Sequence, residues 1–523
     1  MSKIYDYIII GSGFGGSVSA LRLAEKGYSV LVIEQGKRYQ TEDFPKSNWN
    51  LRKYFWIPKL ALYGIQAMTL LKDVFILHGT GVGGGSLVYA NNLLIPPDNV
   101  FDDPRWGSKG WKEKLAPFYK LAQTMLGATP SKVITKADKI LKECAAEIGK
   151  EDTFHVNDVG IYFGEEDVTV PDPYFDGKGP ERTGCTLCGG CMVGCRYGAK
   201  NTLDKNYLYL AEQLGVKIIS ETRVSDVSPQ SENQYKIRTK KVTGLFGKKL
   251  TFKTKGVIFS GGVMGTVKLL HQCKDHGSLP NISDKLGDVI RTNSETLVGV
   301  KANDGEDYSK GIAITSGIYP DKDTHIETVR YAKGQDAMSG LATILTDGKT
   351  GVPRQISFIF AIFRHPIQFI KSFWPFNWAE KTTIFLVMQT ISNYMRFDYK
   401  RRWWLLGKKS MNSNWHTNEK VPSYIPVAND FAKRFAKRVN GMAFNVLPEV
   451  LFDTSSTAHI LGGCIMSDSP KTGVTNFQGQ IHGYKNLYVI DGSIVPANLG
   501  VNPSLTITAL AEYILGQVPK RLD

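Results

Sequence analysis

Three glycines and a later acidic residue have the spacing of a dinucleotide-binding turn. Gly11, Gly13 and Gly16 form the pattern GxGxxG between an apolar run and a helical pattern, and Glu34 ends the next apolar run. This spacing allows a tight turn, a close approach of backbone to a pyrophosphate, and close helix–strand packing. The first N–H groups of the helix would bind phosphate, and Glu34 would accept hydrogen bonds from ribose hydroxyls. The motif predicts a dinucleotide site without separating FAD from NAD.

A second segment contains four closely spaced cysteines. Its pattern, CxxCxxCxxxC, is that of the bacterial ferredoxin run and comprises Cys185, Cys188, Cys191 and Cys195. No proline follows the last cysteine, and the second cluster that it would serve in a ferredoxin is missing. The segment predicts an iron–sulfur centre, with zinc or a set of free thiols in a turn-rich loop as the alternatives.

Two polar residues stand out near the C-terminus, His459 before a glycine pair and Asn502 before a proline and a helical pattern. A lone histidine is more often structural than catalytic, and asparagine before proline is most often a turn former. Taken alone, neither residue predicts chemistry.

Strand–helix–strand patterns must position these motifs. They occur at the N-terminus, in the middle and at the C-terminus, over residues 4–34, 216–271 and 486–518. Parallel strands joined by helices imply a doubly wound sheet, whereas the alternating segments within 291–450 are typical of antiparallel sheet. We predict an α/β chain with a doubly wound, Rossmann-like domain and a second, α+β substrate domain built on an antiparallel sheet.

Length and charge set wider limits. A chain of 523 residues exceeds what one hydrophobic core usually fills, so we expect two domains that share a cleft. The formal net charge of +15 is compatible with nucleic acid, anionic lipid or a merely solvated surface, and we expect no nucleic-acid partner. The N-terminus has no apolar segment followed by a cleavage site, so we expect a cytoplasmic protein.

Five sequence blocks follow one another along nearly the whole chain. They are GSGFGGS from residue 11, GVGGGSLVYANN from 81, VIFSGGVMGTVKLL from 257, HILGGC from 459 and DGSIVPANLGVNPSLTITALAE from 491. The second block alone could be a structural bulge, but its glycines are typical of a loop built for backbone contact. Together the blocks resemble the glucose-methanol-choline (GMC) oxidoreductase family, and within it the cholesterol oxidase type.

The resemblance implies FAD, with residues 81–92 near the flavin ring and residues 491–492 near the ribityl chain and pyrophosphate. The implied FAD-binding residues are Gly11, Ser12, Gly13, Gly16, Glu34, Gly81, Gly84, Gly85, Ser86, Asn91, Val224, Asp491, Gly492 and Asn502. We divide the chain accordingly into an FAD-binding domain (1–130, 200–290 and 450–523), a substrate-binding domain (291–450), and a connecting segment with the cysteines (131–199).

The resemblance also implies that His459 and Asn502 face the flavin. Hydride leaves an alcohol carbon only as the hydroxyl proton is withdrawn, and an imidazole suits that task. Asn502 would hold the substrate oxygen and orient the C–H bond. We expect oxidation of a 3β-hydroxysteroid such as cholesterol, or of another large apolar alcohol, to the ketone, with electrons passed to oxygen or another acceptor.

Cholesterol oxidases also use a carboxylate to move a ring double bond. The nearest counterpart in sequence is Glu380, which precedes the apolar run 383–393. The alternative is a solvated charge at the end of a strand. On the resemblance, we predict that Glu380 is the base for this isomerisation.

Two aromatic and basic stretches, 52–72 and 355–381, could form a lid over an apolar tunnel. Such a lid could rest on a membrane surface, with cationic residues at head groups and aromatic residues below them. The alternative is core sequence with surface charge. The apolar run 356–378 is interrupted by charged residues and proline, and is too short in uncharged residues to span a bilayer. We expect peripheral membrane contact at most.

Two other functions remain open at this level. The first is a flavin and metal-cluster alcohol dehydrogenase that reduces a quinone or a protein acceptor. The second is a non-catalytic flavin scaffold or redox sensor in which the cysteines are the working part.

Overall fold

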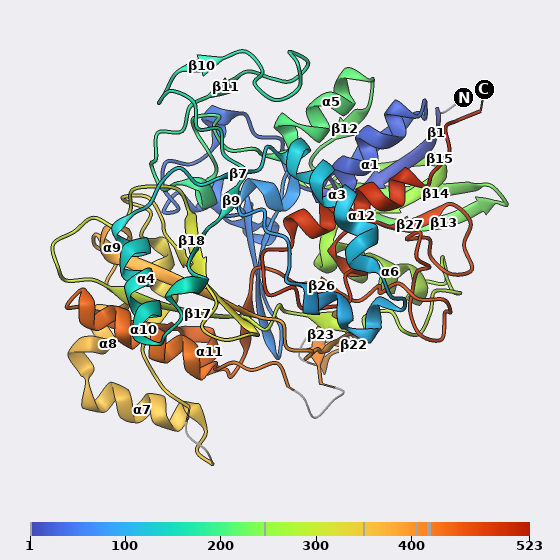
Figure 1. Ribbon diagram of the computed structural model, residues 1–523. Helices are drawn as coiled ribbons and strands as arrows, with labels where there is room; N and C mark the ends of the chain where they lie inside the picture. Colours follow the sequence, from blue (N-terminus) through green and yellow to red (C-terminus); the bar gives the residue numbers. More distant parts are fainter. Residues whose placement is uncertain (1–2, 245–246, 349–350, 404–405, 416–419, 523) are drawn as a thin grey trace.

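The computed structural model describes residues 3–244, 247–348, 351–403, 406–415 and 420–522. The two ends of the predicted FAD-binding domain, residues 1–2 and 523, therefore lie outside the described residues. The described chain is built around two large sheets with helices packed on them (Figure 1), and near the C-terminal end Arg521 pairs with Asp6 of the first sheet at 3.2 Å.

The first sheet is built from both chain ends and the middle, as the three strand–helix–strand patterns predict. Strand β1 pairs in parallel with β2 and β15, and β15 pairs in parallel with β27. The predicted strand over 216–224 is in fact two strands, β12 and β13, separated by a turn at Glu221, which has a φ of 54°. The strands are β12 (Lys217–Ile219), β2 (Val30–Ile33), β1 (Ile4–Ile10), β15 (Lys249–Phe259), β14 (Gln234–Lys241), β13 (Thr222–Ser231) and β27 (Leu487–Val489).

Helices cover this sheet and bury its apolar strands. They are α1 (Phe14–Glu25), α3 (Trp111–Leu126), α5 (Tyr207–Gln213), α6 (Gly262–Asp275) and α12 (Ser504–Gly516). Helix α12 is apolar on nearly all sides because it packs between α1 and α3, and a helix covered on two faces needs no polar stripe.

The second sheet is antiparallel throughout. Its strands, in spatial order, are β20 (Ala342–Ile344), β24 (Met442–Val446), β17 (Thr296–Lys301), β21 (Thr382–Gln389), β19 (Thr324–Val329), β18 (Ile314–Ile318) and β8 (His155–Val156). Helices α4 (Lys136–Glu147) and α10 (Pro426–Arg438) pack on it, with Phe385 of β21 against Phe431 and Phe435. The predicted fold class is confirmed. The connecting segment also contributes β8 and α4 to this layer.

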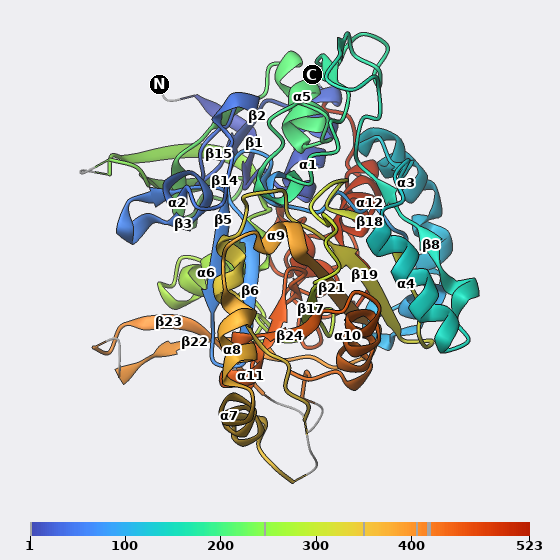
Figure 2. The same cartoon turned by 90° about the vertical axis from the view of Figure 1, so that its left-hand side faces the viewer.

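A three-stranded sheet of β5 (Gln66–Leu70), β6 (Val74–Gly79) and β25 (Ser455–Thr457) runs beside the second sheet (Figure 2). Small elements complete the fold: α2 (Leu51–Tyr54), β3 (Trp56–Ile57), β4 (Leu62–Tyr63), β7 (Thr129–Pro130), β9 (Asp158–Val159), β10 (Thr169–Val170), β11 (Arg182–Thr183), β16 (Ile290–Arg291), α9 (Trp378–Lys381), β22 (Arg396–Arg401), β23 (Lys409–Asn414), α11 (Leu447–Leu451) and β26 (Leu461–Gly462).

Helices α7 (Arg354–Arg364) and α8 (Pro366–Phe373) form a helical pair at the lower edge of the second domain in Figure 1, where Phe358 of α7 packs with Ile344 and Val450. Pro366 starts α8, because its fixed φ suits a first helical position. No helix among the described residues has the length and apolarity that a bilayer crossing requires.

Candidate active site

One cavity of about 740 Å³ is lined by both large sheets and by β5 and β6. Its walls include the turn at residues 10–15 from the start of the chain and His459 and Asn502 from the end. Segments almost 450 residues apart in sequence therefore meet in one space, because β1, β15 and β27 lie side by side in one sheet.

The cofactor end of the cavity is shaped by close backbone contacts. A Cβ on Gly11 would lie 2.3 Å from the carbonyl oxygen of Ser260, and one on Gly15 would lie 1.9 Å from that of Ile490. Gly13 begins α1, which has no side-chain cap and no acidic residue in its first turn. A Cβ on Gly13 would meet no protein atom within 4 Å. Open N–H groups facing open space suit a pyrophosphate, so the residues present fit FAD.

Glu34 lies in the wall of the same cavity. Its carboxylate accepts hydrogen bonds from the backbone N–H of Ser12 (3.1 Å), the Ser12 hydroxyl (2.8 Å) and the N–H of Gly36 (2.8 Å). Burial raises its pKa, and these three donors act against that rise by favouring the charged form. The carboxylate is therefore fixed in place at the end of β2, where a ribose hydroxyl is expected.

His459 and Asn502 lie together at the other end of the cavity, with His459 Nε2 and Asn502 Nδ2 3.4 Å apart. On its far side His459 Nδ1 contacts the buried carboxylate of Glu295, whose other oxygen accepts from the N–H of Ala458 (2.9 Å). Burial disfavours the imidazolium, but the Glu295 carboxylate outweighs burial and raises the pKa of His459. Glu295 therefore orients the ring and leaves Nε2 facing the cavity.

A second acid missed in the sequence lies behind Asn502. Glu327 on β19 accepts hydrogen bonds from Asn92 Nδ2 (2.7 Å) and Asn157 Nδ2 (2.9 Å). Turned with its amide nitrogen toward Glu327, Asn502 donates to it at 3.1 Å, which places its oxygen toward His459. Complete burial raises the pKa of Glu327 to about 8.

The rest of the cavity wall is mostly apolar and aromatic. The residues that give it this character include Trp56, Met68, Phe75, Met192, Tyr331, Met338, Leu341, Trp378, Ile384 and Phe444. A large apolar molecule with one polar end fits such a wall, with its polar end at the histidine and asparagine.

Most of the predicted site residues line this cavity. They are Gly11, Ser12, Gly13, Glu34, Gly84, Gly85, Val224, His459, Asp491, Gly492 and Asn502. Four others do not line it: Gly16 packs against the Gly11 carbonyl, the Ser86 hydroxyl donates to the Gly83 carbonyl (2.7 Å), and Gly81 and Asn91 have positive φ angles within the loop. Gly16 thus allows α1 to pack against the first glycine turn, and the other three shape the loop at 81–92.

The structure does not place Glu380 with His459 and Asn502. Glu380 lies in α9, pairs with Lys333 at 2.7 Å and is absent from the cavity wall. These surroundings fit the alternative interpretation, in which Glu380 is a charge at the end of a strand. The Glu380 side chain is 19% exposed and precedes the start of β21 at Thr382.

The four cysteines also differ from the predicted arrangement. Cys188 is exposed, Cys191 is buried, and Cys185 and Cys195 are partly buried. Within the described part of the chain, no group of three or more His, Cys, Asp or Glu side chains is placed to hold a metal ion. The described residues therefore show no preformed ligand set at the four cysteines, and the predicted iron–sulfur centre stays a prediction.

Lys200, which follows the four cysteines, connects their segment to the glycine-rich loop at 81–92. The buried ammonium of Lys200 donates to the carbonyls of Cys191 (2.8 Å) and Leu87 (3.1 Å). Burial and the nearby Cys188 thiol raise the pKa of Cys191 to about 11, so it is a neutral thiol at neutral pH. The segment therefore supports the loop through backbone contacts.

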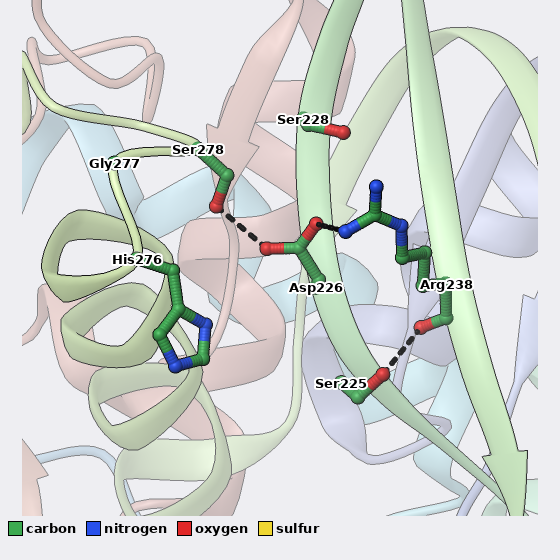
Figure 3. A pocket seen from close by; sticks show the side chains of 7 residues that line it. All are labelled: Ser225, Asp226, Ser228, Arg238, His276, Gly277 and Ser278. Atoms are coloured by element: carbon green, nitrogen blue, oxygen red, sulfur yellow. Dashed lines mark hydrogen bonds and ion pairs between the residues drawn. The ribbon is translucent and has the colours of Figure 1, made fainter.

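A second, smaller hollow lies away from this cavity, between β13, β14 and the end of α6 (Figure 3). Asp226 in its wall accepts from the Ser278 hydroxyl (2.6 Å) and from Arg238 (3.4 Å). Because its central charge is already paired, this hollow carries no chemistry of the kind assembled around His459.

Known proteins resemble this chain over its whole length. The sequence profile described as GMC oxidoreductase matches residues 180–278 and 386–511, and an NAD(P)-binding Rossmann-like domain matches residues 9–40. A cholesterol oxidase of Acinetobacter baumannii is 46% identical over 99% of this chain and 95% of its own length. One from Mycobacterium tuberculosis is 45% identical over 100% and 92%.

Solved structures agree on the fold. Pyridoxine 4-oxidase from Mesorbium loti has a TM-score of 0.62 at 14% identity, covering 98% of this chain and 99% of its own. A formate oxidase has a TM-score of 0.64 at 15% identity, covering 99% and 98%. Because the two cholesterol oxidases are 45–46% identical over nearly the full length, and the cavity that fits FAD also contains His459 and Asn502, the chain belongs to the GMC oxidoreductase family and is an FAD-dependent alcohol oxidoreductase.

Proposed function

We propose that this enzyme oxidises the 3β-hydroxyl of a sterol, or the hydroxyl of a similarly large apolar alcohol, and passes the electrons to oxygen. The observation that carries the proposal is the His459–Asn502 pair at the junction of an FAD-shaped cradle and a mostly apolar, aromatic cavity wall. The names of the two relatives that are 45–46% identical support a sterol, and a 24% identical long-chain-alcohol oxidase of Arabidopsis thaliana supports the wider class.

In the proposed mechanism His459 and Asn502 receive the substrate hydroxyl. His459 Nε2 accepts the hydroxyl proton, and Glu295 stabilises the resulting charge on the ring through Nδ1. One N–H of Asn502 donates to Glu327, and its second N–H donates to the substrate oxygen, so that the C–H bond points toward the cofactor. Bound FAD supplies the hydride acceptor. The apolar wall excludes water from the reacting centre.

Product analysis tests the substrate and the acceptor together. With cholesterol in air we expect the ketone and hydrogen peroxide in equal amounts. Turnover only with an added quinone, and no peroxide, would instead favour the dehydrogenase alternative. That alternative depends on a metal cluster for which the described residues form no ligand set.

Removing the Glu295 charge should shift the pH dependence of flavin reduction. Because Glu295 raises the pKa of His459, the neutral imidazole that accepts a proton accumulates only above that raised value. In Glu295→Gln the pKa of His459 falls, so we expect the acidic limb of kcat/KM to move to lower pH.

The matched control is Glu449→Gln. Glu449 is equally buried and binds the adjacent Thr296 hydroxyl (2.7 Å) and the Leu297 N–H (3.0 Å), without contacting His459. An acidic limb that stays in place in Glu295→Gln, or that moves equally in both variants, contradicts the role given to Glu295.

If double-bond movement accompanies oxidation, we propose that it is served by Glu327, which lies outside the cavity wall but contacts Asn502, rather than by Glu380, which contacts neither His459 nor Asn502. A pKa of about 8 suits a group that must take up and return a proton near neutral pH. In Glu327→Gln we expect the unconjugated ketone to accumulate, while Glu380→Gln gives the products of the parent enzyme. Chromatography of the products distinguishes the two, and equal product ratios in parent and Glu327→Gln exclude Glu327.

We also propose that α7 and α8 rest on an anionic membrane surface from which substrate is collected. Phe360, Phe363 and Ile367 are 70%, 79% and 67% exposed, and Arg364 and Lys371 flank them. Helix α8 packs on β20 and on the turn that contains Met338 and Leu341 of the cavity wall. The apolar face therefore adjoins the substrate end of the cavity.

Charges placed on this face should weaken membrane binding. Burying one Phe contributes about 1.5–3 kcal/mol, so we expect the double variant Phe360→Glu, Phe363→Glu to bind anionic vesicles at least about tenfold more weakly. Vesicle flotation measures this, and activity on detergent-dispersed cholesterol should be retained. The control is Leu214→Glu, an exposed leucine after α5 on the opposite side of the molecule. Flotation unchanged by the double variant contradicts the proposal.

A further inference from the structure

Two histidines lie behind Glu327, outside the cavity. His325 is two residues before Glu327 on β19, so both side chains point to the same face of the sheet. His155 on the edge strand β8 meets His325, with 3.2 Å between the two Nε2 atoms. Tyr319 stacks on both rings, with centroid distances of 5.3 and 4.5 Å. The mechanism above uses none of these groups.

The hydrogen bonds fix how the protons are arranged. His155 Nδ1 is 3.0 Å from the carbonyl oxygen of Thr153, which can only accept, so this nitrogen carries the proton. In the neutral ring, Nε2 of His155 is then an acceptor, and Nε2–H of His325 donates to it. Nδ1 of His325 is left as a lone pair. It has no hydrogen-bond partner among the described residues and lies 3.9 Å from Glu327 Oε1.

Gly317 makes this meeting of imidazoles sterically feasible. It lies on β18 opposite both Glu327 of β19 and His155 of β8. A Cβ at this position would lie 2.4 Å from His325 Nε2 and 3.1 Å from His155 Nε2. Because Gly317 has no side chain, the two imidazole rings have room to contact each other.

The groups form a line from the interior to the surface. Glu327 and His325 are fully buried, whereas His155 on the edge strand is partly exposed. Burial lowers the pKa of both histidines, so both are neutral at rest, while the nearby Gly500 backbone partly offsets burial at His325. A fully buried acid that titrates near neutral pH needs some route by which protons reach it.

We propose that His325 and His155 are the proton path between Glu327 and solvent. A proton leaves the Glu327 carboxyl for Nδ1 of His325, the Nε2 proton of His325 passes to Nε2 of His155, and the Nδ1 proton of His155 leaves to water. Uptake uses the same links in reverse and restores the starting tautomers. One proton is transferred, and no electrons move. Its use in turnover rests on the proposed function, because oxidation of an alcohol releases a proton beside Asn502.

The path itself can be tested without substrate. The oxidised holoenzyme is kept at a pH below the pKa of Glu327, so that this carboxyl group is protonated. After transfer to D2O, infrared difference spectra follow the exchange of its proton for deuterium. The band of Glu327 is the one absent from Glu327→Gln. In Gly317→Ala and His325→Phe we expect this exchange to slow by about a hundredfold, the order of effect of a positioned proton-transfer group.

The control is His271→Phe, which removes a half-buried histidine that lies outside the path. Bound FAD shows that each variant is folded. If both interior variants misfold, His155→Gln tests the same path at its partly exposed end. Exchange as fast as in the parent enzyme in these variants overturns the path, and so does the absence of any carboxyl band that Glu327→Gln removes. Failure of cholesterol to reduce the flavin overturns the proposed function instead, and leaves the exchange result unaffected.

Discussion

Replacing His459 with glutamine is expected to slow flavin reduction by a sterol about a thousandfold while FAD stays bound, because general-base catalysis of this kind contributes on the order of 10²–10⁴. Glutamine keeps a polar side chain toward Asn502 but cannot accept and hold the hydroxyl proton. Anaerobic stopped-flow absorbance of the flavin measures the rate. The flavin-to-protein absorbance ratio measures the bound cofactor.

The control for this prediction is a second histidine in the same cavity wall. His78 on β6 is half-buried, contacts the Thr69 hydroxyl at 3.2 Å, and has a pKa lowered by burial to about 4. Among the residues that the structure describes, it has no acidic partner of the kind that Glu295 provides for His459. We expect His78→Gln to change the rate by less than about tenfold, since it removes packing and not the base. Similar losses in both variants would mean that His459 acts through packing.

Gly13→Ala is expected to weaken FAD binding without unfolding the protein. The new methyl group would meet no protein atom within 4 Å, and Gly13 has an ordinary φ of −72°, so the fold has little reason to change. The methyl group would occupy the space through which backbone approaches the pyrophosphate. We expect at least about tenfold weaker FAD binding, which corresponds to about 1.4 kcal/mol.

Flavin fluorescence released on dilution measures the affinity for FAD, and thermal unfolding of the apoprotein measures the fold. Gly340→Ala is the control, because a methyl group there also meets no atom within 4 Å but lies outside the cavity wall. Full FAD content in Gly13→Ala would show that the pyrophosphate lies elsewhere.

The cofactor half of the site was predictable because its chemistry depends on the backbone. Turns that bring N–H groups to a phosphate need glycine at fixed spacing, so Gly11, Gly13 and Glu34 leave a pattern in a single sequence. The apolar strands that carry them leave an equally clear periodicity. His459 and Asn502 left no such pattern and were identified through family resemblance.

The acids that support His459 were not predictable in this way. Glu295 and Glu327 lie beside or within strands of the second sheet, and pairing across that sheet brings them to the site from positions far apart in sequence. The one local signal is an acidic residue at a position that the strand buries, as in the run 324-THIETV-329. Glu380 lies just before the buried strand β21. The sequence alone does not show whether its side chain points toward the cavity or away from it.

The cysteine segment shows the limit of spacing as evidence. Ligand spacing predicts that four thiols can reach one ion, but whether they converge depends on the turns between them. Here Gly189 has a φ of 75°, and Cys188 and Cys191 on either side of the glycine pair differ in burial.

The central claim is that FAD bound at the N-terminal glycine turn receives hydride from an alcohol held by His459 and Asn502. Anaerobic titration of the purified enzyme with cholesterol, followed by its visible spectrum, tests it most directly. The account predicts that the flavin absorbance bleaches with one equivalent of sterol and returns when air is admitted. A flavin that stays oxidised with cholesterol and with long-chain alcohols alike would contradict it.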